Sequence, residues 1–203
     1  MSIEFLLTSL VVIILPGTGV VLTLAAALSR GFAWSVMTAL ACTIAILPHA
    51  AAAILGLAAL LHASALAFEI VRFAGVGYLL YLGWQTLKER GAMTINPDAP
   101  RASAVRTFMV AMGANALNPK LSVFFLAFLP QFISPQSTAP ALDMAALAAV
   151  FMGMTFAVFA VYGALAALLR QRVLSSARIM AWLRRSFAAA FGLLAVRLAL
   201  AER

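Results

Sequence analysis

The chain has 203 residues, of which 65% are hydrophobic and 10% are charged, and its formal net charge is +8. Soluble domains carry roughly 25% charged residues, so this composition is typical of a membrane protein. A basic soluble protein would suggest nucleic acid, but here the basic residues stand between apolar stretches, and we expect no nucleic-acid partner. The single cysteine, Cys42, excludes an internal disulfide and a paired-cysteine redox centre.

Six apolar stretches are long enough to cross a bilayer, which takes roughly 20 residues. They cover residues 4–28, 36–61, 64–87, 105–133, 141–169 and 180–201. No basic region precedes the first stretch as it would in a signal peptide, so we expect this stretch to remain in the mature protein. The last stretch has a short uncharged centre, which leaves five crossings plus an interfacial helix as the alternative.

The spans fall into two halves around a polar linker. Residues 1–87 hold three spans, residues 88–104 form the linker, and residues 105–203 hold the other three. An odd number of crossings makes the second half enter from the opposite face, which is the topology of an inverted repeat. We therefore predict an all-α polytopic membrane protein in which residues 1–203 form a single transport domain with three-plus-three topology.

The distribution of basic residues predicts the orientation. Ten Lys and Arg residues lie in or beside the loops after the first, third and fifth spans, whereas only Arg197 and Arg203 lie on the other side. Cytoplasmic loops carry the excess of Lys and Arg. We therefore expect those three loops in the cytoplasm and both termini outside.

Polar residues interrupt the middle of the fourth span. They are Asn115, Asn118, Pro119 and Lys120. A charge at this depth is costly and usually faces a partner, a cavity or a substrate. Pro119 has no N–H, so it frees the carbonyl of Asn115 and pushes Asn118 out of helical geometry. Unwound backbone at bilayer depth survives where it lines a protein-enclosed cavity; a kink that binds nothing is the alternative.

A matching break in the first span consists of Pro16, Gly17 and Thr18. Breaks at corresponding positions of two halves are the best sequence pointer to a transporter's binding site. Each break begins a half-helix whose free N–H groups favour an anion. The freed carbonyls of Val12 and Asn115 can accept from an ammonium. The two breaks therefore suit a small amino-acid-like solute, with the seven named break residues as its predicted site.

Two residues are candidates for proton coupling. His49 follows Pro48 near the middle of the second span and could carry a proton at physiological pH. It could equally be a neutral core histidine that donates to a carbonyl. Glu69 lies three residues before Arg72 and is either a coupling acid or one partner of an interfacial ion pair. If protons drive transport, His49 or Glu69 is the predicted coupling group.

Three stretches resemble the LysE/RhtB family of bacterial amino-acid exporters. They are Pro16-Gly17, then the Gly-x-x-Tyr-Leu pattern within residues 73–83, then Asn115-x-x-Asn118-Pro119-Lys120 followed by Phe124-Phe125 and Pro130-Gln131-Phe132. The resemblance covers nearly the whole chain. It implies export of amino acids or close relatives across the bacterial inner membrane, with the lipid bilayer as surroundings and protons as the coupling ion. Thr18, Ala41 and Ala45 depart from the family pattern.

The motifs that would indicate other functions are missing from the sequence. We find no nucleotide-binding motif, no nucleophile–base set and no metal-ligand spacing, and so we expect a secondary transporter that is not an enzyme and needs no cofactor. An integral-membrane enzyme and a non-transporting subunit or scaffold are the rival interpretations. A homodimer is compatible with a chain of this size, although no span carries a decisive motif for it.

Overall fold

The computed structural model describes residues 2–15, 17–61, 103–134 and 136–168, together with scattered positions between 70 and 84 and between 185 and 200. Every element within these residues is a helix, which confirms the predicted all-α class for this part of the chain. The third and sixth predicted spans and the linker lie mostly outside the described residues.

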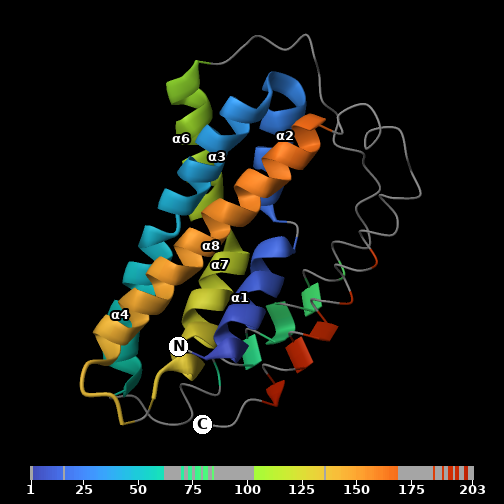
Figure 1. Cartoon of the computed structure of the whole chain (residues 1–203). Helices are drawn as coiled ribbons and strands as arrows, with labels where there is room; N and C mark the ends of the chain where they lie inside the picture. The colour runs from blue at the N-terminus through green and yellow to red at the C-terminus, as the bar shows by residue number, and fades with distance from the viewer. Residues whose placement is uncertain are drawn as a thin grey trace.

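The predicted first span consists of two helices, α1 (Ile3–Ile14) and α2 (Thr18–Arg30), which follow one another at an angle of 56° (Figure 1). The Ser2 hydroxyl starts α1 by accepting from the N–H of Phe5, 3.2 Å away. At the other end, Gly31 adopts a φ of 92°, a left-handed value that glycine reaches without a Cβ clash, and the chain turns directly into the next helix.

The second predicted span consists of α3 (Phe32–Ile44) and α4 (Leu47–Leu61), which join through one turn. In that turn the N–H of Ile46 bonds to the carbonyl of Thr43, three residues back. Together the two helices form an apolar span over Phe32–Gly56. The turn matters for the site because the Ile46 N–H bonds to Thr43 in place of Cys42, four residues back. The Cys42 carbonyl is thereby left for a partner outside its own helix.

The predicted fourth span departs from a regular α-helix at two places, at a break before Pro119 and at a π-helix from Phe124. It comprises α6 (Ala104–Ala116), α7 (Pro119–Val123), the π-helix η1 (Phe124–Phe128) and the 3₁₀-helix η2 (Leu129–Phe132). The break before Pro119 confirms the prediction, whereas the π-helix was not predicted. Short π-helical segments are frequent at functional sites, and this one directly follows the polar break.

The helix α8 (Pro140–Leu168) crosses the other helices and contacts α1, α2, α3 and α4 (Figure 1). It is packed closely against α3 because Gly163 has no Cβ, and a Cβ there would overlap the side chain of Ser35. It is held against η1 by an aromatic cluster in which Phe151 stacks on Phe124 with ring centroids 4.5 Å apart. Phe125 meets Phe151 edge-on at 5.4 Å.

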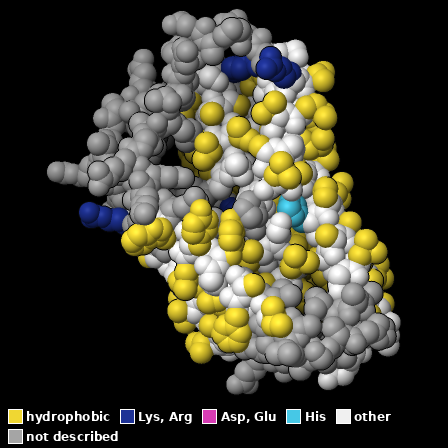
Figure 2. Space-filling view, turned by 180° about the vertical axis from the view of Figure 1, so that it is seen from behind, with side chains coloured by type: hydrophobic (Ala, Val, Ile, Leu, Met, Phe, Trp, Pro, Cys, Tyr) yellow, Lys and Arg dark blue, Asp and Glu magenta, His cyan; other side chains and the backbone are white. Residues whose placement is uncertain are grey.

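The described surface suits a lipid environment. Hydrophobic side chains are spread over the coloured part of the face in Figure 2, and basic side chains appear at its upper end and left margin. Within the described part, Phe32–Gly56 and Pro140–Leu168 are each long and apolar enough to cross a membrane, and α1 with α2 would form a third span. The chain is therefore a membrane protein, as predicted.

Candidate functional site

The two helix breaks meet through the side chain of Lys120. From the start of α7 it reaches across to the end of α1, where Nζ donates to the carbonyl of Val12 at 3.0 Å and to that of Leu15 at 2.8 Å. The side chain is only 7% exposed. Both acceptors are neutral main-chain oxygens, so the charge is held by dipoles at the end of a helix.

The end of α1 attracts a cation for two reasons. The last carbonyls of a helix have no intrahelical partner, and the helix dipole makes this end negative. In addition, Pro16 has no N–H with which to bond the Val12 carbonyl. The Val12 carbonyl accordingly accepts from an ammonium, that of Lys120 of the chain itself, and its predicted role toward a solute stays a prediction.

Asn118 and Asn115 connect the second break to α3. The backbone of Asn118 is extended, with φ −76° and ψ 107°, as expected for a residue before proline. Its Oδ1 accepts from the N–H of Lys120 at 3.1 Å, and its Nδ2 donates to Oδ1 of Asn115 at 3.1 Å. Asn115 in turn donates through Nδ2 to the carbonyl of Cys42 at 2.7 Å. The chain of bonds fixes the backbone from which Lys120 extends.

His49 contacts the carbonyl of Asn115, which loses its usual helical donor at Pro119 and accepts instead from the N–H of Asn118 at 3.1 Å. Its Nε2 lies 3.4 Å from the carbonyl oxygen of Asn115, and its Nδ1 lies 3.3 Å from the hydroxyl of Ser122. Because a carbonyl only accepts, Nε2 carries the hydrogen, and the Ser122 hydroxyl donates to Nδ1 when the ring is neutral. Each freed carbonyl is thus bonded by a side chain from the other half of the sequence.

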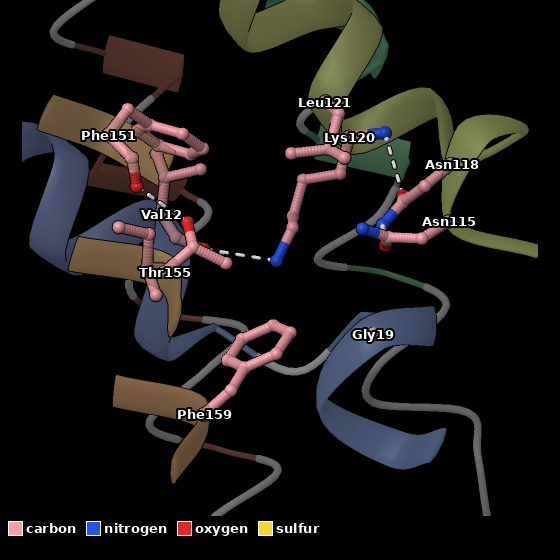
Figure 3. Close-up of a pocket in the computed structure, with 10 residues that line it drawn as sticks. Val12, Gly19, Asn115, Asn118, Lys120, Leu121, Phe151, Thr155 and Phe159 are labelled. Atoms are coloured by element: carbon pink, nitrogen blue, oxygen red, sulfur yellow. Dashed lines mark hydrogen bonds between the residues drawn. The ribbon is translucent and has the colours of Figure 1, made fainter. Parts of the chain in front are cut away.

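A small cavity lies beside Lys120 (Figure 3). Its lining comes from α1, α2, α6, α7 and α8, namely Val12, Ile13, Gly19, Asn115, Asn118, Lys120, Leu121, Phe151, Thr155 and Phe159. The free volume is about 10 Å³, roughly the space for one water. The cavity as it stands is therefore closed to a solute the size of an amino acid.

Two glycines, Gly17 at the first break and Gly19 in the first turn of α2, permit this close packing. A Cβ on Gly17 would lie 3.0 Å from Nζ of Lys120, and a Cβ on Gly19 would lie 2.7 Å from the ring of Phe159. Figure 3 shows the ring of Phe159 directed toward Gly19, with the Lys120 side chain extended between the asparagines and Val12. Small residues at these positions let side chains from α7 and α8 approach the backbone of the break.

The structure brings together five of the nine predicted site residues, counting both breaks and the coupling candidates. They are Gly17, Asn115, Asn118, Lys120 and His49. Pro119 is the first residue of α7. Thr18 begins α2, where it is exposed and does not line the cavity. Pro16 and Glu69 lie outside the described residues.

Sequence reasoning missed the contribution of α8. Phe151, Thr155 and Phe159 line the cavity, and the hydroxyl of Tyr162 donates to the carbonyl of Ile14 at 3.1 Å. The sequence of α8 is apolar on all sides, so no stripe distinguished the face that meets the site from the face that meets lipid. A polar residue at helical spacing from the phenylalanines, such as Thr155, was the available signal.

Comparison with known proteins gives one family and several relatives. A family model described as LysE type translocator matches residues 10–202. The homoserine/homoserine lactone efflux protein of Salmonella typhimurium is 36% identical over 132 residues, which are 65% of this chain and 64% of that protein. The leucine efflux protein of an Enterobacter strain is 29% identical over 51% of this chain and 52% of its own length.

An uncharacterised membrane protein of Pseudomonas aeruginosa has the longer alignment, with 30% identity over 86% of this chain and 78% of that protein. The match to the Salmonella efflux protein spans slightly less than two thirds of that protein's length. No solved structure matches the chain.

Proposed function

The chain belongs to the LysE type translocator family, and on this premise we propose that it is a secondary exporter of amino acids or closely related small solutes. The observation that carries the proposal is the buried meeting of two helix breaks through Lys120. A buried charge inside an apolar bundle is costly, and such residues in membrane helices usually mark a substrate or ion pathway. A mere kink would require neither a buried ammonium nor a polar cavity wall.

The chemistry of the cavity supports a solute with an ammonium group and a compact body. Carbonyl oxygens at the end of α1 accept from a cation, and the start of α2 presents main-chain N–H groups that have no side-chain cap. The remaining wall is mostly apolar, with Phe151, Phe159 and Leu121. An uncharged side chain would lie against these residues, while the asparagines orient the polar groups.

The named relatives narrow the choice of solute. Homoserine, homoserine lactone and leucine all carry an ammonium group on the α-carbon, and none has a charged side chain. We propose solutes of this class for this chain. Homoserine and leucine also carry a carboxylate, for which the Lys120 ammonium is the available counter-cation once it leaves α1.

We further propose that the proton gradient drives export and that His49 or Glu69 carries the coupling proton. His49 is the better supported of the two, because its ring joins the Asn115 carbonyl to Ser122 beside the break. The proposal extends to a three-plus-three inverted repeat in the bacterial inner membrane, with both termini outside. The reciprocal bonding of the two breaks is what such a repeat would produce.

The test is export of labelled homoserine, homoserine lactone, leucine and threonine from proteoliposomes, with and without a pH gradient. Wild type is compared with Lys120→Ala and with Lys88→Ala, which removes the chain's other lysine. We expect saturable, gradient-dependent export that Lys120→Ala abolishes and Lys88→Ala retains. Failure to export any compound would refute the substrate class, and equal export by all three proteins would refute the site.

A further inference from the structure

We propose that the Lys120 ammonium is a tethered stand-in for the ammonium group of the solute. In the empty protein it occupies the carbonyls of Val12 and Leu15, and an incoming solute takes its place there. The inference rests on the proposed export function and adds how the site recognises its substrate. It assigns the two carbonyls as the ammonium subsite and Lys120 as its built-in competitor.

The first argument is chemical identity. A lysine side chain ends in a primary ammonium, and the α-carbon of homoserine, homoserine lactone or leucine carries the same group. The two carbonyls lie 3.0 and 2.8 Å from Nζ and are therefore spaced to receive one ammonium, whichever molecule supplies it. The same pair cannot bind both cations at once at these distances.

The second argument is space. The free volume beside Lys120 is about 10 Å³, too small for any amino acid. Apart from Lys120 and Gly19, the lining residues are branched or aromatic side chains, or asparagines held by hydrogen bonds. The lysine side chain extends across the cavity toward Val12 (Figure 3). Its withdrawal enlarges the cavity at the place where the ammonium subsite lies.

The third argument is that only the side chain has to move. The backbone N–H of Lys120 is held by Oδ1 of Asn118 at 3.1 Å, and Asn118 is held by Asn115. The four-carbon stem of lysine has several rotamers, and its ammonium has three donors that can be oriented freely. The base of Lys120 can therefore stay fixed while its ammonium moves from the α1 carbonyls to the solute.

The exchange also explains how one site can accept both homoserine and its lactone. The two compounds share the ammonium, but only homoserine has a carboxylate with which the displaced Lys120 can pair. Recognition through the carboxylate alone would reject the lactone. Recognition through the ammonium accepts both, and each solute must bind the two carbonyls strongly enough to displace Lys120.

The experiment measures equilibrium binding of homoserine lactone to purified protein, with γ-butyrolactone as the matched compound that lacks the ammonium. Lys120→Met removes the competitor. Lys120→Gln also removes the cation but keeps a side-chain N–H that can donate to the α1 carbonyls. Gly113→Ala is the matched control, because a Cβ there meets nothing within 4 Å.

For Lys120→Met we expect the Kd for homoserine lactone to fall at least about tenfold, because the solute no longer displaces two charge-assisted hydrogen bonds. Lys120→Gln should also lower the Kd, by a smaller factor because its neutral amide still competes weakly for the carbonyls, and Gly113→Ala should leave the Kd unchanged. γ-Butyrolactone should show no such gain with any variant. Should Lys120→Met fail to fold, Lys120→Gln decides the question alone.

The outcomes separate this inference from the export function. If wild type exports homoserine but the Kd for the lactone is unchanged or higher in the folded variants, the stand-in is refuted and the exporter stands. If neither wild type nor any variant binds the lactone, the inference falls, and the export assay decides the function separately. Tighter binding by Lys120→Met together with lost export supports both.

Discussion

Replacing Asn115 with alanine should destabilise the protein more than the loss of any ordinary helix hydroxyl. The Asn115 side chain makes two buried hydrogen bonds, to the Cys42 carbonyl and to the Asn118 amide. Each partner left unsatisfied in a buried site costs about 1–3 kcal/mol. Polar contacts measured in one membrane protein average only about 0.6 kcal/mol, because the membrane-unfolded chain also finds partners. We therefore expect a total loss of about 2 kcal/mol.

The assay is reversible unfolding in mixed detergent micelles, followed by circular dichroism. Asn115→Leu keeps most of the side-chain volume and should lose as much as Asn115→Ala, since polarity and not size is responsible. Thr38→Val is the control, because the Thr38 hydroxyl bonds to the carbonyl of Trp34 within its own helix and its loss should cost little. If Asn115→Ala lost no more than Thr38→Val, the bonds across the break would contribute nothing and the reasoning would be wrong.

The remaining predictions concern helix packing and coupling. Gly163→Ala should destabilise the protein by about 1–3 kcal/mol in the same assay, because its Cβ overlaps Ser35. Gly153→Ala, in the same helix with open space around it, should be neutral; equal losses would rule out close packing at α3. His49→Gln can still donate to the Asn115 carbonyl but cannot carry a proton, so gradient-driven export should stop while substrate exchange continues. Undiminished gradient-driven export by His49→Gln would remove His49 as the coupling group.

Covalent chemistry explains which parts of the site could be predicted. Proline lacks an N–H and restricts its predecessor, so the break at Asn118 and the loss of the usual helical donor to the carbonyls of Val12 and Asn115 follow from the sequence alone. The partners of those carbonyls could not be predicted in the same way. Lys120 lies 108 residues from Val12 and His49 lies 66 residues from Asn115, and only the packing of helices brings them together.

The π-helical interruption of the fourth span, which no proline marks, could not be predicted either. The π-helix η1 begins at Phe124 in an apolar run that is equally compatible with a regular helix. Its first residue, Phe124, stacks on Phe151 of α8, a tertiary contact that local rules do not reveal. In α8 the apolar residues lie on all sides, so Thr155 itself was the one signal there of the face that meets the cavity. Local rules therefore identified the breaks, and long-range packing determined their surroundings.

The hydrogen bonds from Lys120 to α1 have a consequence for biosynthesis. Their acceptors, Val12 and Leu15, precede Lys120 by 108 and 105 residues. When the first helices enter the bilayer, the group that neutralises the end of α1 has not yet been translated. Those carbonyls must be satisfied by water or by insertion machinery until α7 arrives, since an unpaired carbonyl in hydrocarbon is costly. The two halves are therefore expected to mature together, and the first half expressed alone should be prone to degradation.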